Sequence, residues 1–412
     1  MVGNKFRQLS STKNLLIRCI RKISTFFGIW PLTEDMEIKK RTWRSIVIFF
    51  LLALRLLSHT TFLFTHSSAA ISIKGMTFLW IMNAATDQIR IYKQVFENEK
   101  QAKSLRSFFE TNHLSQLEVQ DDYSMKISSN TEKNARLAYV AYMALMTTAF
   151  IIPMIDDMSA NYLAGGFSTS MNVTIVNTMN MAVPLNVETN PIEWFCTFFF
   201  YFFSMFFQML ILVPQQDFIL FYIVYHELIH WRILKSRMLN ISLIINNNNE
   251  DEAYVGSLEK EIYENLKECI RYHNFILKFH KEIQNIYGFL FKTIYFLVVI
   301  YACCTALMLT DSRAGNLNKY ATLLAATYIY LFSWTMFFSQ LKHASGEVGE
   351  VAYSLPWSCM SKRCRQALAM MVMRAQTPVG FRVYGSIETS LETMVQIVKG
   401  SYSMYATLNN FN

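Results

Sequence analysis

Glycine, proline and charged residues are all scarce in this chain of 412 residues. It contains 13 Gly and 7 Pro, and this scarcity argues against an architecture of many short strands joined by tight turns. Charged residues make up 17% of the sequence, whereas an ordinary soluble chain has about 25%. The 7 cysteines include no C-x-x-C pair, which argues against a zinc-binding or thioredoxin-like site. These shortages together disfavour a soluble, turn-rich protein.

Long apolar runs occupy much of the chain, which is 52% hydrophobic and contains 33 Phe, 23 Met and 21 Tyr. A helix rises about 1.5 Å per residue, so about 20 residues cross the roughly 30 Å hydrocarbon core of a bilayer. Runs of that length lie near residues 45–66, 69–92, 136–158, 195–216, 285–309, 319–343 and 386–410. We therefore predict an all-α membrane protein with seven transmembrane helices.

Lysine and arginine are divided unevenly between alternate loops, and the more basic side of a membrane protein generally faces the cytosol. The segment before the first span is rich in both, residues 159–194 contain neither, and residues 310–318 contain only Arg313. This asymmetry predicts a cytosolic N-terminus, and seven crossings then place the C-terminus outside. The net charge of +8 therefore indicates membrane orientation instead of nucleic-acid binding.

Two local signals agree with this orientation. The first 24 residues are basic and amphipathic without a cleavable apolar core, so we expect retained cytosolic chain and not a signal peptide. The sequon Asn172-Val173-Thr174 lies in the loop expected to face outward, so Asn172 is the expected glycosylation site.

The chain between the spans completes the expected organisation. Apolar residues recur at helical spacing from 258 to 283, which predicts a long helix that begins in the cytosol and continues into the fifth span. The segment 350–373 is also helix-like, and the two form an intracellular anchor bundle. The expected divisions are a cytosolic N-terminal segment, 1–44; transmembrane helices 1–4 with an outer loop at 159–194, 45–216; a cytosolic loop and helix extension, 217–284; transmembrane helices 5 and 6, 285–343; a cytosolic anchor helix, 344–385; and a seventh helix, 386–412.

The C-terminal region carries a specific pattern. Its members, in order, are Tyr353, Trp357, Arg374, Gln376, Pro378, Ser390, Leu391, Ser401, Tyr402, Ser403 and Leu408. This pattern resembles the C-terminal signature of insect odorant receptors, in which a cytosolic helix leads into a final membrane helix that lines an ion pore. Elsewhere the resemblance extends only to hydropathy, length and topology.

The resemblance has functional implications. It implies an odorant receptor subunit that binds small volatile apolar molecules and gates a non-selective cation pore, in a heterotetramer with the co-receptor Orco. It also implies the plasma membrane of a sensory-neuron dendrite, with no cofactor and no enzymatic activity.

Polar residues recur at every fourth position near the start of the last predicted span. Glu388, Glu392 and Gln396 lie at i, i+4 and i+8, with Lys399 and Ser403 close to the same face. A charged group at mid-bilayer costs about 2.5–3.5 kcal/mol, so this face is expected to contact protein or water instead of lipid. The spacing alone leaves both a pore-lining face and polar packing inside a bundle open.

The outer end of the same span supplies the expected gate, because the resemblance implies that apolar side chains near this end close the pore. Such a gate works by dewetting. The full set of pore and gate candidates is Glu388, Glu392, Gln396, Lys399, Tyr402, Tyr405, Leu408 and Asn409. Tyr405 and Leu408 are the gate candidates, and Asn409 occupies a position where the co-receptor has an apolar residue.

Aromatic residues and methionine are abundant in the outer halves of the spans, as in pockets for small apolar ligands. The candidates are Trp80, Tyr142, Met146, Thr147, Phe150, Tyr201, Phe203, Phe206, Tyr301 and Tyr320. Aromatic residues also fill the core of any helical membrane protein, so ordinary packing remains the alternative for each of them.

Other functional classes have weaker support. His226-Glu227-Leu228-Ile229-His230 matches the HExxH motif of zinc proteases, but a catalytic zinc needs a third protein ligand and the sequence offers none. A G-protein-coupled receptor would have its N-terminus outside, and the sequence lacks D-R-Y and N-P-x-x-Y at the expected places. A gustatory receptor is the nearest alternative, and the pair Tyr402-Ser403 favours the olfactory branch. No metal site is expected.

Overall fold

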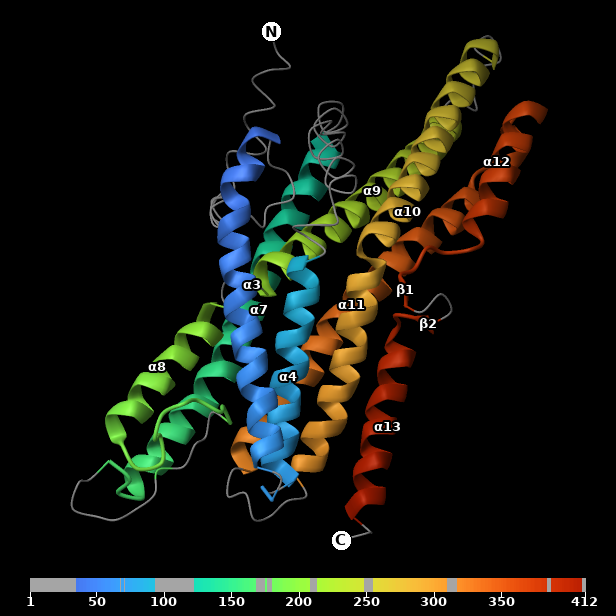
Figure 1. Cartoon of the computed structure of the whole chain (residues 1–412). Helices are drawn as coiled ribbons and strands as arrows, with labels where there is room; N and C mark the ends of the chain where they lie inside the picture. The colour runs from blue at the N-terminus through green and yellow to red at the C-terminus, as the bar shows by residue number, and fades with distance from the viewer. Residues whose placement is uncertain are drawn as a thin grey trace.

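The protein is an elongated bundle of helices in a computed structural model (Figure 1). The structure describes residues 35–66, 68–69, 71–92, 122–167, 175, 180–207, 213–247, 255–309, 317–383 and 387–409. The longer helices are α3 (Asp35–Thr65), α4 (Ile71–Tyr92), α7 (Asp122–Leu163), α8 (Pro191–Phe207), α9 (Val213–Asn247), α10 (Val255–Met308), α11 (Leu317–Ser354), α12 (Lys362–Ala375) and α13 (Leu391–Asn409). Within the described residues the only sheet is a two-stranded hairpin, so the all-α prediction is confirmed.

Three described stretches are long and apolar enough to cross a membrane by length and composition. They are Ile46–Thr65 in α3, Tyr287–Met308 in α10 and Tyr320–Ser354 in α11. The predicted span 69–92 corresponds to α4, and the predicted span 136–158 falls within α7. The predicted fourth span is divided between α8 and α9, and residues 208–212 between them lie outside the described chain.

Helix α10 is the longest helix in the described chain. Its 54 residues extend without a break from the region expected in the cytosol into the fifth predicted span, which confirms the predicted long helix. Figure 1 shows it beside α11, with α4 along its lower half and α9 along its upper half. One continuous helix thus joins the membrane-like part of the fold to the part that projects beyond it.

Helix α9 corrects one expectation. Residues 217–247 are helical, whereas the sequence predicts a cytosolic loop there. The physical reason is a buried stripe at spacings of three and four residues, which includes Leu220, Val224, Leu228, Trp231, Leu234, Met238, Ile241 and Ile245. This stripe packs against α10 and α11, so tertiary contact stabilises a helix that carries many polar residues on its other face.

The anchor bundle consists of α12 together with the parts of α9, α10 and α11 that pack near it (Figure 1). Its core is continuous and apolar, and it includes Met238, Ile241, Ile262, Leu266, Ile276, Leu341, Val348, Cys364, Leu368 and Met371. Each fully buried aliphatic side chain of this kind contributes about 1.5–3 kcal/mol relative to exposure. The bundle therefore forms a rigid base for the segment that follows it.

The chain reverses direction between α11 and α12, where the sequence predicts one helix-like segment over 350–373. Helix α11 ends at Ser354, Pro356 follows, and a short 3-10 turn, η5, covers Trp357–Cys359. Proline has no backbone N–H and disfavours a helical residue before it, which explains the stop. The side chain of Ser361 then caps α12 by accepting the N–H of Cys364.

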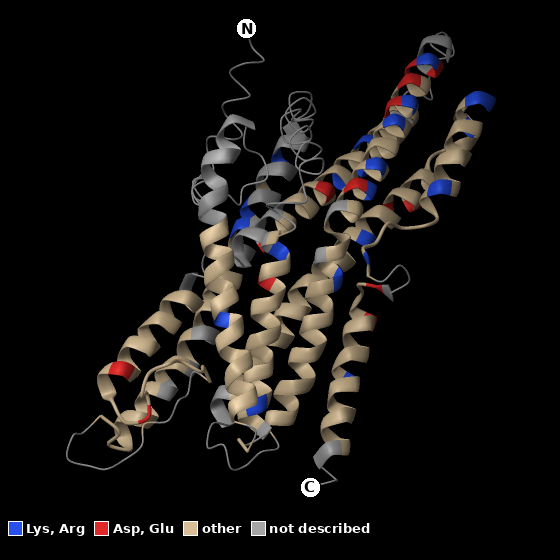
Figure 2. Ribbon diagram, in the orientation of Figure 1, with Lys and Arg blue, Asp and Glu red and all other residues tan. Residues whose placement is uncertain are grey.

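Charged side chains are concentrated on the anchor bundle and on the helix ends beside it (Figure 2). The opposite portions of α3, α4, α10 and α11 carry few of them. This division matches a membrane-embedded part and a water-exposed part. On α9, Arg232 and Lys235 are the first arginine and lysine after the predicted fourth span, so we expect the boundary near them.

Candidate functional site

A short connector links the anchor bundle to α13. After α12 it contains Pro378, strand β1 (Arg382–Val383) and strand β2 (Ile387–Glu388), which pair antiparallel with Arg382 opposite Glu388. Phe381 is buried, and its ring lies 4.8 Å from that of Phe338 on α11, centroid to centroid, and 5.2 Å from that of Phe291 on α10. The connector is therefore seated in the groove between α10 and α11.

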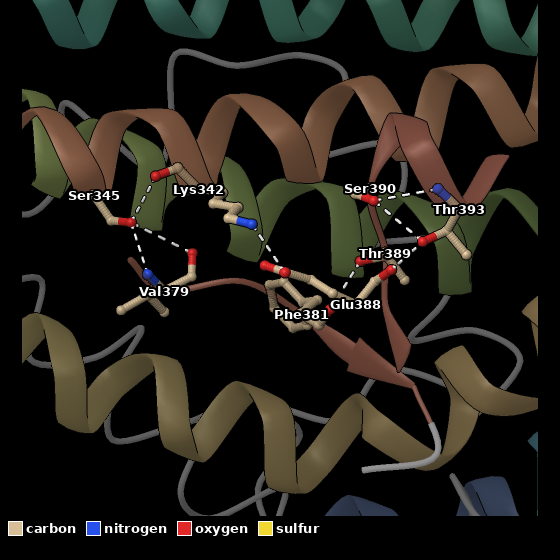
Figure 3. Close-up of polar contacts among 8 residues, drawn as sticks. All are labelled: Lys342, Ser345, Val379, Phe381, Glu388, Thr389, Ser390 and Thr393. Carbon is tan, nitrogen blue, oxygen red and sulfur yellow. Dashed lines mark hydrogen bonds and ion pairs between the residues drawn. The ribbon is translucent and has the colours of Figure 1, made fainter. Parts of the chain in front are cut away.

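Hydrogen bonds hold the same connector in place (Figure 3). The hydroxyl of Ser345 accepts the N–H of Val379 at 2.8 Å and donates to the Lys342 carbonyl at 2.8 Å. On the other side, the amide of Gln284 donates to the Arg382 carbonyl at 2.9 Å and accepts the Arg382 N–H at 3.2 Å. Helices α10 and α11 thus each supply one side chain that pairs with connector backbone.

An ion pair joins the connector to α11. The ammonium of Lys342 lies 2.9 Å from the Glu388 carboxylate, and the two side chains are 43% and 33% exposed. Gly380 lies against this pair, and a β-carbon at that position would overlap the Glu388 carboxylate. Only glycine therefore fits at residue 380 without displacing Glu388.

Helix α13 begins after the connector. Ser390 accepts the N–H of Thr393 at 3.3 Å, which is the side-chain bond of an N-cap residue. The Thr393 hydroxyl donates to the Glu388 carbonyl at 2.7 Å. The helix consequently starts at Leu391, and Glu388 belongs to β2 instead of the predicted helical stripe. This corrects the expectation for Glu388, because the hairpin and its cap interrupt the i+4 spacing.

One face of α13 packs on α10 and α11. The buried hydroxyl of Ser401 lies 2.9 Å from the Tyr328 hydroxyl, and the Thr335 hydroxyl lies 3.5 Å from the Met394 sulfur. Ile397 is partly buried on the same side. These contacts hold α13 against α11 between Met394 and Ser401.

The other face of α13 is exposed and carries a polar stripe. Its polar exposed residues are Glu392, Gln396, Lys399, Ser403 and Thr407, with Gly400 beside them, and the apolar or aromatic residues Leu391, Val395, Tyr402 and Met404 are exposed as well. No atom lies within 4 Å of the place a β-carbon at Gly400 would occupy. Tyr402 is 69% exposed, whereas Tyr405 is partly buried. Leu408 and Asn409 are helical, but their side chains lie outside the described part.

Four predicted ligand residues do come together. Trp80, Tyr301 and Tyr320 pack in one cluster with Met76, Leu79 and Met308. The Tyr301 hydroxyl donates to the Leu79 carbonyl at 3.1 Å, and Trp80 meets Tyr201 edge to face at 6.1 Å between ring centroids. This apolar cluster lies at the ends of α4, α10 and α11 that are farther from the anchor bundle (Figure 1).

The remaining ligand candidates lie elsewhere. Phe203 is 64% exposed on α8, and the Thr147 hydroxyl donates to the Met143 carbonyl of its own helix at 2.7 Å. Tyr142 instead donates to Asp217, as described next. The side chains of Met146, Phe150 and Phe206, and the whole of Asn172, lie outside the described residues.

A buried polar cluster joins four helices, and the sequence predicts only part of it. The Asp217 carboxylate accepts the hydroxyls of Tyr142 at 2.8 Å and Tyr330 at 3.2 Å. Arg90 interacts electrostatically with Asp217 and lies 3.9 Å from Asp87. The Asp87–Arg90 pair follows from their i, i+3 spacing. For Asp217 the sequence shows only an ionisable residue at the end of a predicted span, which does not predict its partners.

The HExxH residues contribute to helix packing. The Glu227 carboxylate lies 2.8 Å from the His280 ring and 3.4 Å from the Trp231 ring nitrogen, and the His230 ring lies 2.6 Å from the Tyr272 hydroxyl. Across the described residues, no three His, Cys, Asp or Glu side chains are grouped so as to hold a metal ion. The motif therefore links α9 to α10 within the core.

Comparison with known proteins identifies the family. The family model for the 7tm odorant receptor matches residues 95–402. The chain belongs to the insect odorant receptor family. This membership agrees with the C-terminal signature. The family is one of multi-pass membrane receptors and not of enzymes, and it is distinct from the G-protein-coupled receptors considered as the alternative.

Individual odorant receptors show the extent of the similarity. The chain is 28% identical to odorant receptor 67c of Drosophila melanogaster over 159 residues, which are 39% of each chain. It is 22% identical to odorant receptor Or2 of Anopheles gambiae over 162 residues, 38% of this chain and 42% of that receptor. The matched segments thus span about two fifths of these receptors' length.

Solved structures extend the fold match to the whole chain. The olfactory receptor OR5 of Machilis hrabei, in complex with eugenol, superposes with a TM-score of 0.73 over 96% of this chain and 99% of that one, at 13% sequence identity. The same receptor in a second structure gives a TM-score of 0.72 at 15% identity. The seven-helix membrane fold predicted from the sequence is confirmed.

Proposed function

We propose that this protein is an odorant-binding subunit of a ligand-gated cation channel, with α13 lining the pore. The observation that carries the proposal is the two-faced character of α13. One face is fixed to α11 through Ser401 and Met394, while the other presents Glu392, Gln396 and Ser403 outward. A membrane helix with such a face needs water or protein beside it, and a shared central pore satisfies that need.

The same geometry supports assembly around an axis. Because α13 lies at the edge of the bundle (Figure 1), its polar face is free to meet the same helix of neighbouring subunits. Each copy of this subunit would contribute one Glu392 to the pore lining, and acidic side chains there favour cations. The proposed complex is a heterotetramer with Orco in the plasma membrane. The proposed orientation has a cytosolic N-terminus and an extracellular C-terminus.

The proposed activating ligand is a small, volatile, apolar molecule. The cluster of Trp80, Tyr301 and Tyr320 is the best-supported place for it, because it is aromatic and lies in the half of the membrane proposed to be outer. Binding opens the pore only if the ligand has a higher affinity for the open arrangement. Helices α10 and α11 contact both this cluster and α13, so they are the proposed route of coupling.

Electrophysiology tests the proposal directly. The chain is co-expressed with Orco, and currents are recorded while a panel of volatile compounds is applied. We expect ligand-evoked cation currents whose reversal potential shifts when Glu392→Lys reverses the charge that this subunit contributes to the pore. Glu268→Lys is the matched control, because Glu268 is exposed on the anchor part of α10. Equal reversal potentials in the two variants would remove Glu392 from the pore.

A further inference from the structure

A groove of about 640 Å³ lies between α7, α9 and α11. That volume is within the roughly 300–1,000 Å³ typical of sites for small molecules. Its wall is mostly apolar and includes five aromatic side chains, and the rings of Phe221 and Phe337 stack at 4.3 Å between centroids. Trp80, Tyr301 and Tyr320 do not line it, so the groove is separate from the proposed odorant cluster.

Polar side chains gather at one end of the groove. Asn134 is the first lining residue of α7, while Arg232 and Gln340 are the last lining residues of α9 and α11. Helix α7 runs away from the anchor bundle, and α9 and α11 run towards it (Figure 1). These three side chains therefore lie at the end nearest the anchor bundle, where charged residues become frequent (Figure 2).

At this end of the groove, the guanidinium of Arg232 has no ion-pair partner among the described residues. It is exposed, and no carboxylate in the described ranges forms an ion pair with it. One turn along α9, Lys235 is engaged with Glu347 at 2.7 Å. A guanidinium fork binds a phosphate through two parallel hydrogen bonds. Arg232 is thus a cation at the membrane boundary, at the mouth of an apolar groove.

We propose that the groove binds one membrane phospholipid, with its phosphate on Arg232 and an acyl chain along Phe221, Trp334 and Phe337. Exposed Ala141, Ile329 and Ser333 border the groove, so it is open along its length towards the lipid side. A phospholipid combines an anionic group at the interface with an apolar chain running into the membrane, and basic pockets between membrane helices bind such head groups. A volatile apolar odorant would leave Arg232 without a counter-charge.

The proposal requires that the bundle spans a membrane, but it does not require ion conduction. Its position gives the lipid a structural consequence. Tyr142 and Asp217, of the buried polar cluster, also line the groove, so the acyl chain would cover a polar contact that joins α7 to α9. Occupancy would therefore stabilise the packing of these helices.

Photo-crosslinking in lipid nanodiscs tests the site. The full-length receptor, co-assembled with Orco, is reconstituted with phosphatidylcholine that carries a diazirine midway along one acyl chain. A second preparation contains diazirine-labelled diacylglycerol, which has no phosphate. After illumination, labelled peptides are mapped by mass spectrometry. We expect enrichment on the peptides containing Phe221 and Trp334 with phosphatidylcholine, and at least about fivefold less with diacylglycerol.

Two pairs of variants decide between specific binding and general contact with lipid. Arg232→Gln should lower this labelling about fivefold, and Arg271→Gln, an exposed arginine on the anchor part of α10, should not. Ser333→Trp should fill the groove and abolish labelling, whereas Ala325→Trp, on an exposed position of α11 that does not line the groove, should leave it unchanged. Gel filtration of each variant verifies folding.

Three results would overturn the proposal. Equal labelling by phosphatidylcholine and diacylglycerol would refute the proposed contact between the lipid phosphate and Arg232. Undiminished labelling in Arg232→Gln would refute the same contact. Labelling that persists in Ser333→Trp would show that the lipid lies outside the groove. If Arg232→Gln does not fold, the pair of variants Ser333→Trp and Ala325→Trp and the comparison of the two lipid probes still test whether the groove binds a phospholipid. Odorant-evoked currents report separately on the proposed channel function, so the failure of one does not imply failure of the other.

Discussion

The ion pair between Lys342 and Glu388 joins α11 to the segment that starts α13, so its loss should alter channel gating. The atoms lie 2.9 Å apart, and both side chains are about a third or more exposed. Exposed pairs of this kind contribute about 0.2–1 kcal/mol. If the pair forms in only one of the two gating states, its loss should shift the ligand concentration for half-maximal current by up to roughly fivefold, since about 1.4 kcal/mol corresponds to tenfold.

A double-mutant cycle measures this coupling. Lys342→Met, Glu388→Gln and the double variant are co-expressed with Orco, and concentration–response curves are recorded with one activating volatile. We expect both single variants to shift the curve in the same direction, and the double variant to shift it no further than either one. Non-additivity of this form isolates the energy of the pair itself.

Glycine substitutions provide an independent test of the same contact. Gly380→Ala introduces a β-carbon that overlaps the Glu388 carboxylate, so it should displace Glu388 and reproduce the shift. Gly346→Ala is the matched control, because its β-carbon would meet Pro378 at an ordinary 3.6 Å. Strictly additive single-variant effects, or a normal response from Gly380→Ala, would refute the proposed role of the pair.

Three further predictions concern stability and are measured by unfolding of the purified protein in detergent. Leu266→Ala, in the fully buried anchor core, should lower the free energy of unfolding by about 2–5 kcal/mol. Tyr328→Phe removes the hydroxyl paired with Ser401 and should cost about 0.5–1.5 kcal/mol. Burial, and to a lesser degree Arg374, lowers the pKa of His273 from 6.5 to about 4. The unfolded chain then takes up a proton first as pH falls, so Tm should drop between pH 6.5 and 4, and His273→Phe should reduce that drop.

The regular apolar pattern of the anchor helix made that part of the fold predictable. Ile262, Leu266, Phe279 and Ile283 recur at helical spacing in the sequence, and all of them are buried in the core. The pattern extends into an apolar run without proline and with Gly288 as its one glycine, so one continuous helix was the simplest interpretation. Helix α9 was less predictable, because its buried stripe is mixed with charged residues such as Arg232 and Lys235 that suggest a loop.

The start of α13 shows why spacing alone is insufficient. Glu388, Glu392 and Gln396 have perfect i+4 periodicity, yet a hairpin occupies the first position and the helix follows Ser390. Serine is a preferred N-cap residue, and Ser390 stands directly before Leu391 in the sequence. Local capping chemistry, when weighed against periodicity, would have placed the helix start correctly.

The ligand candidates could not be grouped from sequence, because their grouping depends on contacts between distant helices. Tyr142 lies at the same expected depth as other aromatic candidates, but its hydroxyl is fixed by Asp217, 75 positions away. A buried carboxylate without partners costs several kcal/mol in an apolar medium. The membrane helices therefore gain stability only in the register that brings Tyr142, Tyr330 and Arg90 to Asp217. This pairing involves residues from four helices, so the sequence of any one helix does not predict it. It is the reason that Tyr142 does not join the cluster around Trp80.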